Sequence, residues 1–115
     1  MRALLQRTTG ARVRAGGEIV GEIGQGLVVF VGVGPDDDDG VADALARRIS
    51  ELRIFRDAEG RTNRSLTDME GEALIVSQFT LYADTRRGHR PGFTGAAAPD
   101  LAERLYRRLA APLTG

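Results

Sequence analysis

The fold of this chain is decided by the stretch Leu27-Val28-Val29-Phe30-Val31-Gly32-Val33. It is apolar and rich in β-branched side chains, which is typical of a strand buried on both faces of a sheet. Gly34 and Pro35 end the strand, and four Asp residues (36–39) follow it. We expect these carboxylates to provide the N-cap and first turn of a helix rather than a cation site.

Short strands are predicted on the N-terminal side of this stretch. Residues 2–8 and 11–15 form two of them, separated by Gly10. Gly16-Gly17 then predicts a tight hairpin turn into a third strand over 18–24.

The residues that follow predict two helices, two strands and two loops. The spacing of apolar residues predicts a helix over about 38–52. Residues 53–55 resemble a short strand, 61–71 a polar loop, and Glu72–Leu81 a second strong strand. Residues 83–98 form an irregular loop rich in Gly and Arg.

The second helix begins at Pro99-Asp100, and Pro112 is expected to stop it. The sequence thus predicts one strand-rich domain of mixed α/β (α+β) class with two helices.

Composition excludes several classes of chemistry. The 115 residues suit one domain, and 16 basic residues balance 16 acidic ones, so the bulk charge does not imply attraction to nucleic acid or to an anionic membrane. All 16 basic residues are Arg, which excludes Schiff-base chemistry and a P-loop lysine. Without Cys, and with His89 as the only His, thiol catalysis and thiolate or His-rich metal sites are excluded too. No apolar run is long enough for a membrane span or a signal peptide, which predicts a soluble, cytoplasmic protein.

A first candidate site lies at the end of the predicted strand 72–81. Ser77, Gln78, Phe79 and Thr80 bring polar side chains to both faces there. This pattern suits a strand that simply enters solvent. From composition alone this is the favoured interpretation; the other is a cleft in which hydroxyl, amide and backbone N–H groups hold a carbonyl oxygen and its developing charge.

A second candidate is the loop over residues 85–93. Its arginines, including Arg90, could contact phosphates while Phe93 stacks on a base, although such a basic loop is often only solvated. His89 lacks an orienting carboxylate nearby in the sequence, which argues against it as a general base.

Taken together, the motifs resemble the D-aminoacyl-tRNA deacylase family. The match is carried, in the family's order, by the following residues: Leu4-Leu5-Gln6-Arg7, Arg53-Ile54-Phe55-x-Asp57-x-Glu59-Gly60, Asn63, Ser77-Gln78-Phe79-Thr80-Leu81 and Gly88-x-Arg90-Pro91. The resemblance spans essentially the whole chain.

This resemblance implies a cytoplasmic homodimer with a β-barrel-like mixed sheet. Family members hydrolyse the ester that joins a D-amino acid, or glycine, to the acceptor end of tRNA, and they need no metal or other cofactor. Neither a membrane nor DNA is an implied partner. The residues implied as catalytic are Ser77, Gln78, Phe79 and Thr80, and those implied as substrate-binding are Gln6, Arg7, Arg90 and Phe93. Thr80 is expected to position the substrate rather than act as a nucleophile.

Two departures from the family pattern stand out. Gly92 replaces the usual Ser after Arg-Pro, and the second motif, Asn-x-Gly-Pro-Val-Thr with a cis Gly-Pro bond, is not found by residue 115. We therefore expect residues 1–115 to be a single deacylase-like domain that is truncated at its C-terminus.

Two expectations follow from the missing motif, and one alternative function is set against them. Arg7, which braces the Gly-Pro loop in the family, should turn to solvent or to an acidic side chain. Discrimination against L-amino acids should suffer more than ester cleavage. The alternative is a non-catalytic RNA- or nucleotide-binding barrel that lost its activity together with the motif.

Overall fold

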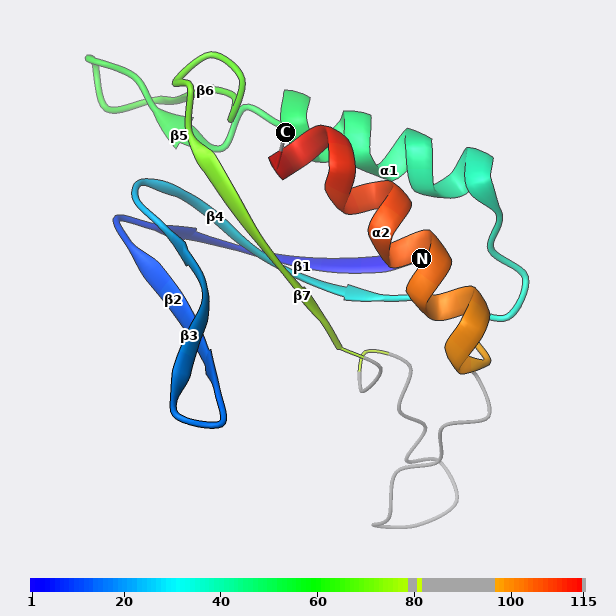
Figure 1. The fold of residues 1–115 in the computed structure, drawn as a ribbon. Helices are drawn as coiled ribbons and strands as arrows, with labels where there is room; N and C mark the ends of the chain where they lie inside the picture. The colour runs from blue at the N-terminus through cyan, green and yellow to red at the C-terminus, as the bar shows by residue number, and fades with distance from the viewer. Residues whose placement is uncertain (79–80, 82–96, 115) are drawn as a thin grey trace, which may run out of the picture.

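A three-stranded mixed sheet forms the centre of the fold (Figure 1). The computed structural model describes residues 1–78, 81 and 97–114. The sheet consists of β1 (Arg2–Thr8), β4 (Gly26–Gly32) and β7 (Glu72–Ser77), in the order β1-β4-β7. β4 is antiparallel to β1 and parallel to β7. The predicted α/β class with a mixed sheet and two helices is confirmed, whereas closure into a barrel is not among the described strand pairings.

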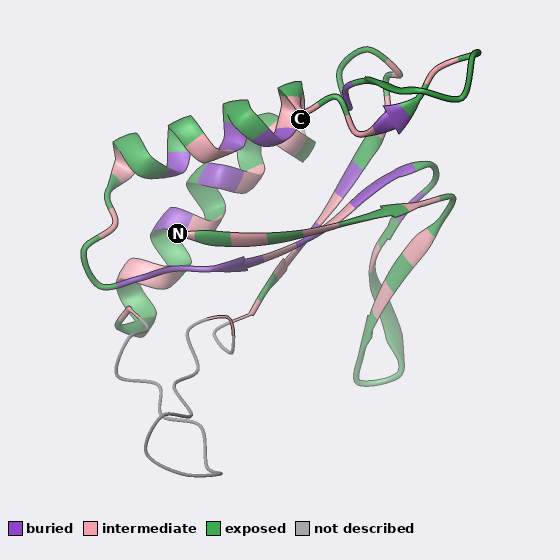
Figure 2. Cartoon of the chain, turned by 180° about the vertical axis from the view of Figure 1, so that it is seen from behind, coloured by how far each residue is buried: buried purple, intermediate pink, exposed green. Residues whose placement is uncertain are grey.

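The two faces of this sheet differ in burial (Figure 2). On the helix-covered face, Leu27, Val29 and Val31 of β4 join one apolar cluster with residues of both helices and are at most 1% exposed. The open face carries the alternate residues, among them Leu4 and its cross-strand partner Phe30. Leu4 is 57% exposed and Phe30 is half-buried. The expectation that β4 is buried on both faces is therefore right for one face and only partly right for the other.

The hairpin of β2 (Ala11–Ala15) and β3 (Glu18–Ile23) forms where the glycine pair predicts it. Gly16 and Gly17 have φ angles of 59° and 83°. Two consecutive residues with positive φ are what a tight hairpin turn requires, and glycine adopts them without steric cost.

The acidic run after β4 begins helix α1 (Asp39–Glu51), as predicted. The side chain of Asp38 accepts a hydrogen bond from the backbone N–H of Val41 at 2.9 Å, which is the contact of an N-cap. Asp37 accepts the N–H of Gly34 at 2.7 Å and forms an ion pair with the amino group of Met1 at 2.6 Å. These carboxylates thus stabilise the β4–α1 connection.

Helix α2 (Pro99–Thr114) packs against β7 and α1 through a buried stripe that includes Leu105 and Leu109. The hydroxyl of Tyr106 donates a hydrogen bond to the carbonyl of Ile75 in β7 at 2.7 Å. The expectation that Pro112 stops the helix is wrong, because α2 continues to Thr114. Pro has a backbone angle compatible with a helix, and the following residue, Leu113, packs against the core, which favours one further turn.

The segment between α1 and β7 is more ordered than predicted. The expected strand at 53–55 is shifted, since β5 comprises Phe55–Arg56, and the expected polar loop contains β6 (Thr62–Arg64). The two strands pair antiparallel, and Phe55 is buried against the core. The polar residues of β6 are all exposed, so apolar alternation could not reveal this strand. Among the described residues, neither helix is long and apolar enough to cross a membrane.

Candidate active site

The first candidate site begins where β7 separates from the central strand. The N–H of Gln78 donates to the carbonyl of Val31 at 2.7 Å, one residue after the end of β7 at Ser77. The predicted strand to Leu81 is therefore too long. The next carbonyl on the same edge of β4, that of Val33, accepts the N–H of Ala97 at 2.9 Å. Because the segment leading into α2 occupies this position, β7 cannot extend further along β4.

A short turn holds the chain at this end of the sheet. The N–H of Leu81 donates to the carbonyl of Gln78 at 3.3 Å. The guanidinium of Arg2, at the start of β1, donates to the carbonyl of Leu81 at 2.8 Å. β1, through Arg2, and the central strand β4, through the carbonyl of Val31, thus both contribute to fixing the backbone around Gln78.

The two described residues of the motif point to opposite faces of the sheet. Ser77 pairs with Val31 on the helix-covered side and is exposed at the strand end. Gln78 follows on the side of the open face and is half-buried. Phe79 and Thr80 lie outside the residues that the structure describes.

The predicted substrate-binding residues Gln6 and Arg7 lie at the other end of the sheet. Arg7 is opposite Leu27, whereas Ser77 is opposite Val31, four residues further along β4. At the rise of a β-strand, four residues correspond to about 13 Å. Within one subunit the structure therefore does not bring Gln6 and Arg7 together with Ser77 and Gln78. The remaining predictions, Arg90 and Phe93, also fall outside the described residues.

Arg7 has a partner, but not the one expected. Its side chain is exposed, and its guanidinium donates to the backbone carbonyl of Ile54 at 3.0 Å, just before β5. The expectation of a turn toward solvent is met, while the partner is a carbonyl rather than an acidic side chain. This contact ties the end of β1 to the β5–β6 segment.

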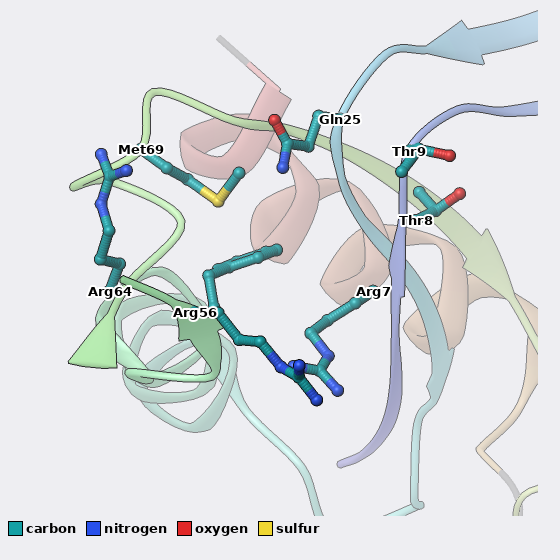
Figure 3. Close-up of a pocket in the computed structure, with 8 residues that line it drawn as sticks. Arg7, Thr8, Thr9, Gln25, Arg56, Arg64 and Met69 are labelled. Atoms are coloured by element: carbon teal, nitrogen blue, oxygen red, sulfur yellow. The ribbon is translucent and has the colours of Figure 1, made fainter. Parts of the chain in front are cut away.

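A second candidate site, the arginine cavity, lies at this end of the sheet (Figure 3). Its volume is about 550 Å³. Three of the lining residues are cationic and none is acidic. The lining residues are Arg7, Thr8, Thr9, Gln25, Phe55, Arg56, Arg64 and Met69.

Two aspartates fix the loops that carry Arg56 and Arg64. Asp57 accepts the N–H groups of Glu59 and Arg61 at 2.9 and 3.0 Å and so closes the β5–β6 turn. Asp68 accepts the N–H of Ser65 at 2.9 Å. In both cases the backbone N–H donor stabilises the carboxylate and lowers the pKa of the aspartate below its usual value.

The sequence did not identify Arg56 and Arg64 as members of a site. Residues 56–64 combine basic and acidic side chains around a turn, and this pattern is typical of a solvated surface. The signal that could have found them is the Asp57-x-Glu59-Gly60 turn, because it returns the chain on itself and brings the residues before and after it close together.

Comparison with known proteins assigns the chain to a family. Residues 4–114 match the family model described as D-Tyr-tRNA(Tyr) deacylase. The chain is 59% identical over 113 residues to the D-aminoacyl-tRNA deacylase of Dinoroseobacter shibae, covering 98% of this chain and 78% of that protein. It is 56% identical over 108 residues to the enzyme of the same name from Symbiobacterium thermophilum, covering 94% and 72%. The chain belongs to the D-aminoacyl-tRNA deacylase family. The resemblance seen in the motifs is thereby confirmed.

A solved structure supports the fold. The chain superimposes on a c-Myc DNA unwinding element binding protein with a TM-score of 0.91, at 36% sequence identity, covering 98% of this chain and 76% of that one. The deacylase fold observed here is therefore shared with a protein that is named for binding DNA.

Proposed function

We propose that this member of the deacylase family hydrolyses the ester of D-aminoacyl-tRNA, and of glycyl-tRNA mischarged on alanine tRNA, as a proofreading step in translation. One observation carries the proposal: the family match covers residues 4–114, and the relatives quoted above are more than half identical over nearly the whole chain. This similarity includes both β7 and the segment that follows it.

The reaction needs little from the protein beyond placing the ester. Water attacks the ester carbonyl, the bond to the ribose oxygen breaks, and free D-amino acid and tRNA are released. The negative charge that develops on the carbonyl oxygen requires preorganised donors. The chain offers such donors where backbone and amide groups follow the end of β7.

Ser77, Gln78, Phe79 and Thr80 are proposed to form this part of the site. The support within the described residues is the fixed backbone at Gln78, which is bonded to β4 through its N–H and to Leu81 through its carbonyl. The N–H of Gln78 is itself occupied by Val31, so what the fixed backbone provides is a set position for the Gln78 side-chain amide, the donor proposed here, without a cost at the moment of reaction. Thr80 is proposed to position the substrate, since no Lys is available to activate its hydroxyl.

A homodimer is part of the proposal. Exposed apolar side chains on the open face, of which Leu4 is the clearest, suit burial against a second copy. Gln6 and Arg7 lie about 10 and about 13 Å along the sheet from Ser77, and a two-fold interface could bring them to the partner's site. Sedimentation velocity at micromolar concentration should give a dimer, and a monomer alone would refute this part.

The function is tested with charged tRNA. The purified protein, at a tenth of the substrate concentration or less, is mixed with D-Tyr-tRNA or with L-Tyr-tRNA, and the released tyrosine is measured over time. We expect turnover of the D-substrate. A Gln78→Ala variant purified in parallel controls for contaminating hydrolases. Equal release by both proteins, or no release above the spontaneous rate, would refute the proposal.

A second candidate function is binding of nucleic acid without catalysis. It is favoured by the similarity to a protein named for DNA binding and by three arginines lining one cavity. This candidate predicts that deacylated tRNA binds while D-Tyr-tRNA stays intact, so a measurement of tRNA binding made beside the assay of tyrosine release separates the two functions.

A further inference from the structure

The arginine cavity concentrates positive charge in a protein whose net charge is zero. Arg7 comes from β1, Arg56 from β5 and Arg64 from β6, and no carboxylate lines the cavity. In Figure 3 the side chains of Arg7 and Arg56 both extend into the cavity that they line. Two guanidinium groups that converge without a carboxylate repel each other, and an anion between them would remove that repulsion.

The three arginines differ in how far other groups already neutralise them. Arg64 lies within the electrostatic range of Asp57 and Asp68, and its guanidinium donates to the carbonyl of Asp68 at 3.0 Å. Arg7 donates to the carbonyl of Ile54 through one nitrogen only, which leaves further donors of its fork. Within the described part of the chain, the side chain of Arg56 forms neither a hydrogen bond nor an ion pair. Arg56 is therefore the arginine most available to a ligand.

The rest of the lining suits a phosphate better than an apolar ligand. The hydroxyl groups of Thr8 and Thr9 and the amide of Gln25 line the cavity beside the cations. Guanidinium forks match the oxygens of phosphate, and hydroxyl and amide groups are common further donors to nucleic-acid backbones. Phe55 is buried in the core, so the aromatic side chain there is not available for stacking on a base.

We propose that the arginine cavity binds backbone phosphate of the tRNA substrate, with Arg56 and Arg7 as the principal contacts and Arg64 at the side. This inference rests on the proposed function for the identity of the RNA. The cavity and the end of β7 are separated by about 13 Å along the sheet. Phosphate contacts in the cavity would position the RNA strand, while the residues after β7 would bind the ester.

The test is the salt dependence of binding to deacylated tRNA. Each phosphate contact releases counterions and contributes about 0.7–0.9 to the slope of log K against log salt concentration. We expect Arg56→Gln to reduce the slope by about that amount and to weaken binding roughly tenfold at 0.1 M NaCl, the effect of one charge-assisted hydrogen bond. Arg56→Lys keeps the charge but not the fork, so it should retain the slope and lose part of the affinity.

Arg14→Gln is the matched control. Arg14 is exposed on β2 near the tip of the hairpin, and it does not line the cavity. The same charge is removed, yet slope and affinity should stay close to those of the wild type. Equal effects of Arg56→Gln and Arg14→Gln would show that only net charge matters and would overturn the proposal. So would inorganic phosphate binding that depends on Arg56 when tRNA binding does not.

Two substrates separate failure of this inference from failure of the proposed function. Arg56→Gln should lower kcat/KM for D-Tyr-tRNA but not for the D-tyrosyl ester of adenosine, which has no upstream phosphate. An equal loss on both substrates would refute the phosphate site. If the wild type cleaves neither substrate, the proposed function fails, and the salt slopes of the Arg56 and Arg14 variants still decide the cavity.

Discussion

The helix-covered face and the open face of the central sheet are built from alternate residues of the same three strands, yet they face different environments. On the covered face Leu27, Val29 and Val31 are at most 1% exposed beneath α1 and α2. On the open face Leu4 is 57% exposed and Phe30 is half-buried. The period of a strand distributes residues between two faces, but only the neighbouring elements determine whether a face is buried.

The largest expected effect compares the same substitution on the two sides. Leu105→Ala removes a fully buried side chain of α2 and should lower the free energy of unfolding by about 2–5 kcal/mol, from lost transfer energy and a cavity. At a protein concentration low enough for the chain to be monomeric, Leu4→Ala should cost less than about 1 kcal/mol, because the side chain of one subunit alone is more than half exposed. Urea unfolding at low protein concentration measures both. A loss at Leu4 as large as that at Leu105 would show that the open face is also buried in solution.

The sequence predicts the covered face better than the open one. Apolar periodicity located α1, α2, β4 and the start of β7, because each must bury a stripe or face in one core. The predicted end of β7 is wrong because Ala97, remote in sequence, bonds the carbonyl of Val33 just after β4, which is the next acceptor along this edge. Nothing in the local pattern after Leu81 carries that information.

The candidate sites show the same division. The Ser77–Thr80 motif is visible in the sequence because polar residues interrupt an apolar strand. The arginine cavity is not, because Arg7 comes from β1, whereas Arg56 and Arg64 come from the β5–β6 pair much later in the chain. Arginines spread in this way are typical of a solvated surface until the fold brings them together.

The second prediction uses two adjacent residues that point to opposite faces. If the substrate ester is held on the side of the open face, Gln78→Ala should lower kcat/KM for D-Tyr-tRNA by about a hundredfold, as for loss of one preorganised donor. Ser77→Ala, on the helix-covered side, should lower it by less than about tenfold, equivalent to one ordinary hydrogen bond. Initial rates of tyrosine release measure both. The reverse order would place the ester on the covered side of the strand end.

A smaller effect is expected where α2 contacts β7. Tyr106→Phe removes only the hydroxyl that donates to the carbonyl of Ile75, so the packing of the ring remains. The free energy of unfolding should fall by about 1 kcal/mol, the net value of a typical hydrogen bond. The control is Thr114→Val. It removes the hydrogen bond that the Thr114 hydroxyl donates to the carbonyl of Ala110 at the exposed end of α2. An equal loss in the two variants would show that helix stability, rather than the contact with β7, determines the effect.

The smallest effect concerns the outer side of the covering layer, where Arg108 of α2 binds Asp43 of α1. The guanidinium donates through two nitrogens, at 2.8 and 2.9 Å, and chiefly through this hydrogen bonding it lowers the pKa of Asp43. A carboxyl group whose pKa is lowered by folding stabilises the folded state above its ordinary pKa of about 3.9, and this contribution is lost as the pH falls through the lowered value. Asp43→Asn should therefore destabilise the protein slightly at pH 7, and the difference from wild type should vanish at strongly acidic pH. Because both side chains are about half exposed, added salt should reduce the difference at pH 7 as well.

Glu18→Gln, on the exposed hairpin, provides the control for loss of a carboxylate outside the helix pair. Urea unfolding at pH 7 and below pH 3, each at low and high salt, measures these differences. A difference between Asp43→Asn and wild type that persists in acid would mean that the aspartate contributes through packing and not through its charge.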